Sequence, residues 1–111
     1  MKSRKEIKKE IIEKIEEYRL TKRKAVVMNK YISDDSSQAT EKVIEDLKLI
    51  NIMEGALNSL TQKERLLIIY RYIENNGEMY DYIVKNKLRV SERTYYRIKN
   101  NALLKLHEYL Y

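Results

Sequence analysis

The residues best suited to chemistry lie near the C-terminus, in a basic stretch that follows Ser91. Side chains that can bind nucleic acid recur there at steps of three, one and three residues: Arg93, Tyr96, Arg97 and Asn100. On a helix these positions share one face. Arginine can form a two-pronged contact with the O6/N7 edge of guanine, and asparagine with the N6/N7 edge of adenine. The pattern therefore predicts a helix that contacts base edges in the major groove of duplex DNA.

The distribution of charge along the chain supports this prediction more strongly than the net charge does. The chain has 111 residues and a net charge of +6. Between Lys85 and Lys105 there are seven basic residues and a single acid, Glu92. Four side chains beside the predicted face suit phosphate contacts, which add affinity but no sequence information: Lys85, Lys87, Arg89 and Lys99. An ordinary solvated helix surface is the alternative interpretation of the same charges.

The helix that must position these residues is predicted to begin after Ser91. The Ser91 hydroxyl can accept from a free backbone amide at the helix start, and Glu92 suits the positive end of the helix. An apolar stripe marks the inward face: Tyr95, Ile98, Ala102 and Leu106, continued by Tyr109 or Leu110. A short helix over residues 79–89 precedes it, with inward positions at Met79, Ile83 or Val84, and Leu88. Together they form the helix-turn-helix pattern.

A further helix is predicted before this pair. Thr61 and Glu64 fit a capping box, in which each side chain accepts a hydrogen bond from the other residue's backbone amide. Apolar and aromatic residues are dense between Leu66 and Ile73, so this helix is predicted to be the most buried. The sequence Asn75-Asn76-Gly77 should end it, because these residues readily adopt left-handed backbone conformations.

Two amphipathic helices are predicted in the N-terminal half, over residues 2–28 and 41–59. Their apolar stripes are Ile7, Ile11, Ile15 and Tyr18 in the first, and Val43, Leu47, Ile50, Met53 and Leu57 in the second. The first segment is one long helix with a polar waist, or a helix followed by an arm. The two stripes can pack within one chain or between two chains.

A polar linker separates these helices, and it offers three N-cap candidates: Ser36, Ser37 and Thr40. We therefore expect a basic amphipathic helix or arm at 1–32, a linker at 33–40 and a helix-turn-helix domain at 41–111. The predicted fold class is all-α. Proline is absent and there are only two glycines, which agrees with long helices.

Composition argues against several other classes of protein. There is no cysteine, His107 is the only histidine, and Asp34-Asp35 lies in the linker. We therefore expect no catalytic site, no metal site and no cofactor. No apolar run approaches the roughly 20 residues that span a bilayer, and the charged N-terminus does not fit a secretory signal. A cytoplasmic protein that does not bind membranes is the simplest expectation.

Two stretches together resemble a known family of regulators. They are "LTQKERLLIIYRYI" and "LRVSERTYYRIKNNALLKLHEYL", at residues 60–73 and 88–110. They resemble the DNA-binding region four of bacterial sigma factors and, more closely, the ArpU/RinA-type late-gene transcription regulators of phages that infect low-GC Gram-positive bacteria. The residues that carry the likeness are Leu60, Glu64, Arg65, Arg71, Tyr72, Ser91 to Arg97, Ala102, Leu103 and Leu106. The likeness covers residues 60–110 well, 33–59 loosely and 1–32 barely.

This resemblance implies a sigma region-four-like domain of three or four helices that binds double-stranded promoter DNA. It implies activation of phage late genes for packaging, morphogenesis or lysis, in the cytoplasm of the bacterial host. The positions that match DNA contacts in sigma factors are Glu92, Arg93, Tyr96 and Arg97. The family usually has a small residue where Lys85 stands and Gly or Asn where Arg89 stands, so a slightly altered turn is expected. The first helix lacks the sigma region that melts promoters.

The candidate site is therefore defined by two sets of residues. The DNA-binding set is Ser91, Glu92, Arg93, Thr94, Tyr96, Arg97, Lys99 and Asn100, and the phosphate set is Lys85, Lys87 and Arg89. We expect a homodimer or higher oligomer, because single modules bury little surface on DNA. Two alternatives stay open: a DNA-packaging component such as a small terminase subunit, and an adaptor whose partner is RNA polymerase.

Overall fold

The computed structural model describes residues 2–29 and 40–111, and in these residues every regular element is helical. The elements are α1 (Arg4–Asn29), α2 (Thr40–Asn58), α3 (Gln62–Ile68), η1 (Ile69–Ile73), η2 (Glu74–Gly77), α4 (Asp81–Leu88) and α5 (Glu92–Leu110). The predicted all-α class is confirmed. No helix in the described ranges is long and apolar enough to cross a bilayer. Residues 33–39 of the predicted linker, with Ser36 and Ser37, lie outside the described residues, and Thr40 is the first residue of α2.

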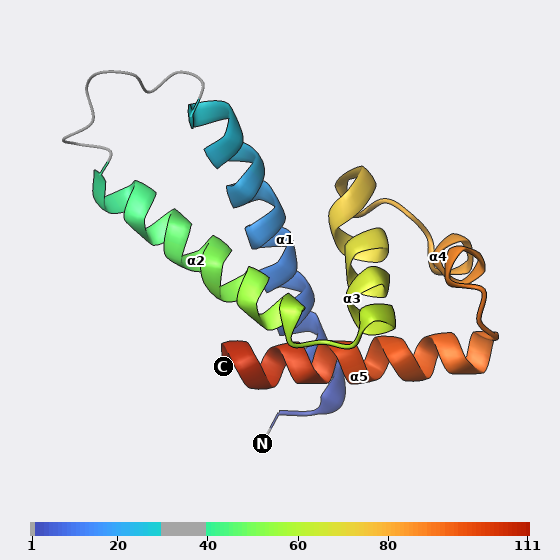
Figure 1. The fold of residues 1–111 in the computed structure, drawn as a ribbon. Coiled ribbons are helices and arrows are strands. Elements are labelled where there is room, and N and C mark those ends of the chain that lie inside the picture. Colours follow the sequence, from blue (N-terminus) through green and yellow to red (C-terminus); the bar gives the residue numbers. More distant parts are fainter. Residues whose placement is uncertain (1, 30–39) are drawn as a thin grey trace.

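The helix α5 runs across the ends of the other long helices (Figure 1). It contacts α1, α2, α3 and α4, and α1 also packs against α2. The short helix α4 lies beside the N-terminal end of α5, at the far end of the molecule from α2 (Figure 1). This arrangement leaves the beginning of α5 at an edge of the molecule, where its outward side is open.

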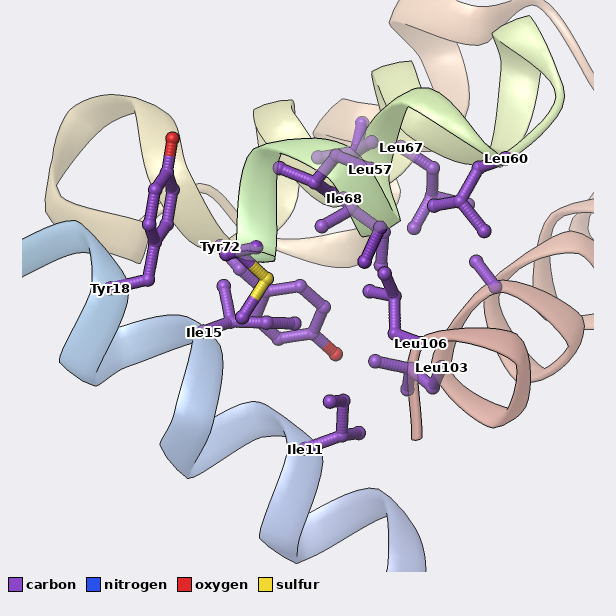
Figure 2. Packing of buried hydrophobic residues seen from close by; sticks show 14 of the residues in the cluster. Ile11, Ile15, Tyr18, Leu57, Leu60, Leu67, Ile68, Tyr72, Leu103 and Leu106 are labelled. Carbon is purple, nitrogen blue, oxygen red and sulfur yellow. The ribbon is translucent and has the colours of Figure 1, made fainter. Parts of the chain in front are cut away.

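One hydrophobic core joins α1, α2, α3, η1, α4 and α5. Ile11 and Ile15 of α1 are fully buried, and Figure 2 shows them facing the interior that they share with Leu103 and Leu106 of α5. The two N-terminal stripes thus pack within one chain, the simpler of the two possibilities. The first helix is a structural part of the same core as residues 41–111, and it does not stand apart from them as an extension.

The predicted stripes are buried only in part. In α2, Ile50, Met53 and Leu57 are buried, whereas Val43 is half-buried and Leu47 remains 48% exposed. The N-terminal half of α2 diverges from the bulk of the core, so its apolar positions meet fewer partners (Figure 1). The structure also decides between residues that the sequence left as alternatives. Val84 is buried and Ile83 is only half-buried, while Leu110 packs on the core and Tyr109 is exposed.

The ends of the central helices follow the local sequence signals. Thr61 and Glu64 form the predicted capping box, with the Glu64 amide donating to Thr61 Oγ1 at 3.2 Å and the Thr61 amide donating to Glu64 Oε1 at 2.9 Å. The helix then widens into the π-helical turn η1, which the apolar density had not indicated. Asn75, Asn76 and Gly77 all have positive φ, as the sequence predicted.

Glycine is needed at position 77 for two reasons: its φ is 72°, and neighbouring atoms occupy the space that a side chain would need. A Cβ atom at this position would lie 2.3 Å from Arg19 Nη1 and 3.0 Å from the Tyr72 carbonyl oxygen. Arg19 extends from α1 and donates a hydrogen bond of 2.8 Å to that same carbonyl. One turn further along α1, Arg23 donates to Asn76 Oδ1 at 2.8 Å. The loop after η1 is therefore bound directly to the first helix.

Candidate nucleic-acid interface

The start of α5 is built as the sequence predicted. Ser91 is the N-cap, and its Oγ accepts a hydrogen bond of 3.2 Å from the Thr94 amide. The Ser91 hydroxyl also donates to Thr94 Oγ1 at 3.0 Å. Arg89 supplies the turn before it with φ 56° and ψ 46°, the left-handed conformation that Gly or Asn adopts more easily. The expected difference at this turn is therefore one of residue type only. Its backbone has the conformation that glycine would favour.

The two faces of α5 separate clearly. Tyr95, Ala102 and Leu106 are fully buried, and Ile98 packs against the core. On the other side, five members of the predicted DNA-binding set are exposed: Ser91, Glu92, Arg93, Tyr96 and Arg97. Thr94 and Asn100 are half-buried. Within the described residues, neither Arg93 nor Arg97 forms an ion pair or a side-chain hydrogen bond, so both guanidinium groups face solvent.

Lys99 is placed differently from the rest of the set. Its side chain is only 15% exposed, and its Nζ lies 3.0 Å from Asp81 Oδ1 and 3.1 Å from Oδ2. The ammonium group also lies near the rings of Tyr72 and Tyr96. Lys99 therefore joins α5 to α4 within the protein, and its ammonium group is bound to a carboxylate that also pairs with Arg71.

The predicted phosphate contacts surround this face on the α4 side. Lys87 and Arg89 are exposed, with the Lys87 ammonium 5.0 Å from the centre of the Tyr70 ring. Lys85 is half-buried and borders a hollow of about 160 Å³ between α4 and α5. The other residues around this hollow are Asp81, Tyr82, Glu92, Tyr95 and Tyr96. Basic groups of α4 and the turn thus lie next to the exposed start of α5.

Asp81 organises the site, and sequence reasoning did not single it out. Its Oδ1 accepts hydrogen bonds from Arg71 Nε at 3.0 Å, Tyr95 Oη at 2.6 Å and Lys99 Nζ at 3.0 Å. Burial alone would raise the pKa of Asp81, but the hydrogen bonds from Tyr95 and Lys99 outweigh it and hold the pKa below its usual value. One carboxylate thus fixes α4 against both η1 and α5. The only sequence signal was an acid in the first turn of a short helix.

Two buried tyrosines, Tyr72 and Tyr95, lie in the same region. Burial raises the pKa of Tyr72 to about 12. The pKa of Tyr95 is raised further, by burial and by its hydrogen bond to the Asp81 carboxylate. Both rings therefore stay neutral at physiological pH. The Tyr95 ring also contacts that of Tyr96 edge-on at 5.2 Å, which supports the exposed Tyr96 from behind.

His107 lies near the C-terminal end of α5, beyond the predicted DNA-binding residues. Its Nε2 is 3.1 Å from Glu10 Oε2 of α1, and its ring stacks on Tyr111 at 4.5 Å. Glu10 also pairs with Lys2. Among the residues that the structure describes, no group of three His, Cys, Asp or Glu side chains is arranged to hold a metal ion.

The chain was compared with known proteins at the levels of sequence and structure. No protein-family model, no curated protein sequence and no solved structure matches it.

Proposed function

We propose that the chain is a sequence-specific DNA-binding regulator of transcription, and that α5 is the helix that enters the major groove. The division of α5 into two opposite faces supports this most directly. Tyr95 and Leu106 anchor one face in the core, while Arg93 and Arg97 project from the other with no partner among the described residues. In helix-turn-helix proteins, the N-terminal residues of the second helix contact the bases. Here the free guanidinium groups belong to that half of α5.

Roles within the proposed interface follow from side-chain chemistry. Arg93 and Arg97 are assigned to guanine edges and Asn100 to an adenine edge, with Tyr96, Thr94, Glu92 and Ser91 beside them. Lys87, Arg89 and Lys85 are assigned to phosphates. Lys99 is left out of the proposed contacts, because Asp81 already binds its ammonium group. The resemblance to ArpU/RinA-type regulators favours phage late promoters as the duplex, with activation of the late genes as the outcome.

The proposal is tested by measuring discrimination between duplexes. A preferred duplex is first selected from a random pool with the full chain, and its affinity is compared with that of a scrambled duplex. Changing Arg93 and Arg97 together to Ala should reduce this ratio by about 5- to 150-fold for each lost two-pronged contact, on the basis of roughly 1–3 kcal/mol per contact. The matched control changes Lys42 and Lys48 of α2 to Ala, which also removes two exposed positive charges.

The control should keep the ratio, and both variants should unfold at the same temperature as the original chain. Absence of any preferred duplex, or an unchanged ratio in the Arg93/Arg97 variant, would contradict the proposal.

The proposal includes assembly on DNA as a homodimer or higher oligomer, because two copies place two helices on half-sites one helical turn apart. Light scattering of the protein with its preferred duplex should then give two chains per site, or a small multiple of two. Closed rings of many chains without DNA would instead favour a packaging component. Binding to RNA polymerase that survives the Arg93/Arg97 change, without duplex binding by the original chain, would favour an adaptor.

A further inference from the structure

The first turns of α1 extend beyond the core. Ile11 is fully buried, and Glu10 bonds to His107 of α5, so α1 meets α5 at this level. Toward the N-terminus, Arg4, Lys5 and Lys9 are exposed and Lys8 is half-buried. In Figure 1, α1 passes α5 and the chain begins on the side of α5 away from α2 and α3. About two turns of α1 therefore lie outside the space that the other helices enclose.

The core-facing side of α1 changes character where it passes α5. Positions 4, 8, 11, 15 and 18 follow one another at steps of four, three, four and three, so they lie on one face of the helix. The last three are Ile11, Ile15 and Tyr18, all buried in the core. The first two are Arg4 and Lys8, and the half-buried Ile7 lies beside them on the same face. A helix face that is apolar against protein and cationic beyond it suits an anionic surface next to α5.

This part of α1 lies on the same side of α5 as the proposed base contacts. Asn100 and His107 are seven residues apart, and seven residues make almost two full turns, so both project from one side of α5. The hydrogen bond between His107 and Glu10 therefore places the beginning of α1 along the side that carries Asn100. Arg93 lies one full heptad before Asn100 and shares that side.

Distance along α5 indicates which part of a duplex would meet α1. Arg97 and His107 are ten residues apart, which corresponds to about 15 Å along the helix axis. The major groove of B-DNA is about 12 Å wide. Because the N-terminal residues of such a helix contact the bases, the end that carries His107 lies outside the groove, and the first turns of α1 lie beside the sugar–phosphate backbone that borders it.

The charges around this end of α1 are arranged to leave the cations available. Glu10 is already bound to Lys2 and His107. Four positive side chains line one shallow, open hollow together with Ile12 and Glu13: Arg4, Lys5, Lys8 and Lys9. The charged groups at this surface are thus mostly positive, and they border a hollow whose own lining is largely apolar.

We infer that Arg4 and Lys8 of α1 contact phosphates flanking the bases that α5 contacts, so that the DNA-binding surface comprises two helices. This inference rests on the proposed function of α5. Phosphate contacts set affinity and register, whereas base contacts set sequence preference. The two helices therefore have different roles: α5 determines which duplex is bound, and α1 contributes to the affinity for it.

The test changes Arg4 and Lys8 to Gln in the full chain and measures affinity for the preferred duplex over a range of salt concentrations. Each phosphate contact contributes about 0.9 to the slope of log affinity against log salt. Loss of two contacts should lower the slope by about 1.8 and reduce affinity by up to about 60-fold at 0.1 M salt. The ratio between preferred and scrambled duplexes should not change. The matched control changes Lys42 and Lys48 to Gln.

Shortening the duplex provides the second measurement. Removal of the flanking base pairs should weaken binding of the original chain to the same degree, and should weaken the Arg4/Lys8 variant no further. An unchanged salt slope, or equal sensitivity of both proteins to shortening, overturns the inference while leaving the α5 proposal intact. A lowered ratio in the Arg4/Lys8 variant also overturns it. Failure of the original chain to prefer any duplex removes the proposed function itself.

Discussion

At the scale of single residues, the carboxylate of Asp81 determines how α4 and α5 meet. It joins Arg71, Tyr95 and Lys99, which come from two other elements. All four side chains are at least half-buried, so these hydrogen bonds are protected from water more than those of a surface ion pair. The position of the exposed face of α5 therefore depends on a residue that does not belong to that face.

Replacing Asp81 with Asn should destabilise the fold, because Arg71 and Lys99 would keep their charges while losing their anionic partner. Hydrogen bonds to charged groups contribute about 1.5–3 kcal/mol each, and partial relaxation should limit the net loss to about 2–3 kcal/mol in the free energy of unfolding. Urea denaturation at neutral pH measures it. Glu108→Gln at an exposed position of α5 is the control, and an equal effect of both changes would contradict the prediction.

The same variant should alter the response to acid. The folded pKa of Asp81 is lowered, so its contribution to stability is present above the unfolded pKa of about 3.9 and is lost as pH falls through the folded value. The pKa of Glu64 is also lowered, because hydrogen bonds from Thr61 and Lys105 outweigh the burial that would raise it. Stability measured from pH 7 to pH 2 should therefore fall less steeply in the Asp81 variant than in the original chain.

Sequence reasoning at this scale found the exposed residues and missed the organising one. Arg93 and Arg97 were predicted because charge at helical spacing is visible along the chain. Asp81 was not, because its role depends on the packing of η1 and α5 around the start of α4. Lys99 illustrates the same limit: its charge was evident, but the partner that binds it lies 18 residues away.

At the scale of elements, the turn between α4 and α5 combines a good cap with an unfavourable residue. Ser91 caps α5, which typically contributes about 1 kcal/mol. Arg89, one position before Val90, adopts a left-handed conformation that costs about 1–2 kcal/mol for a residue with a side chain. The turn therefore carries a positive charge at a cost in stability that glycine would not have.

Comparison of Arg89→Gly with Arg89→Ala separates these two effects. Glycine relieves the backbone and should stabilise the fold by up to about 1 kcal/mol, whereas alanine should not. Both changes remove the positive charge, so both should lower the affinity for DNA by the same factor if Arg89 contacts a phosphate. Thermal unfolding and duplex binding measure the two effects. Equal stability of the two variants would show that the conformation is not strained.

Helix boundaries could be predicted wherever a local signal exists. Thr61–Glu64, Ser91 and Asn75-Asn76-Gly77 each act within a few residues, and each forms the structure expected of it. The π-helical turn η1 and the exposure of Leu47 could not be predicted, because both depend on how separate helices pack. Periodicity shows which side of a helix is apolar, but not how far along the helix that side is covered.

At the scale of the whole molecule, α1 belongs to the same folding unit as the helices that carry the site. Its stripe was visible in the sequence, but its packing against α2, η1 and α5 was not. Arg19 and Arg23 bind the loop at Tyr72 and Asn76 in addition. Periodicity could not show this, because the partners lie 53 residues further along the chain.

Truncating a buried residue of α1 should therefore destabilise the entire chain. Ile15→Ala should lower the free energy of unfolding by about 2–5 kcal/mol, a loss similar to that of Leu106→Ala in α5. Hydrogen exchange of α5 amides should accelerate in both variants. Unchanged exchange in α5 after the Ile15 change would mean that α1 folds as a separate unit, and Leu20→Ala at an exposed position is the control.

The anchoring of α5 through Asp81 also bears on how such a protein could acquire new targets. Tyr95 and Lys99 hold the helix from the inner side, so the outward positions 93 and 97 have no structural duty within the described chain. A library randomised at these two positions should consist mostly of folded members that differ in the operator they prefer. Under the proposed function, selection, natural or in the laboratory, could therefore change the preferred duplex without rebuilding the scaffold.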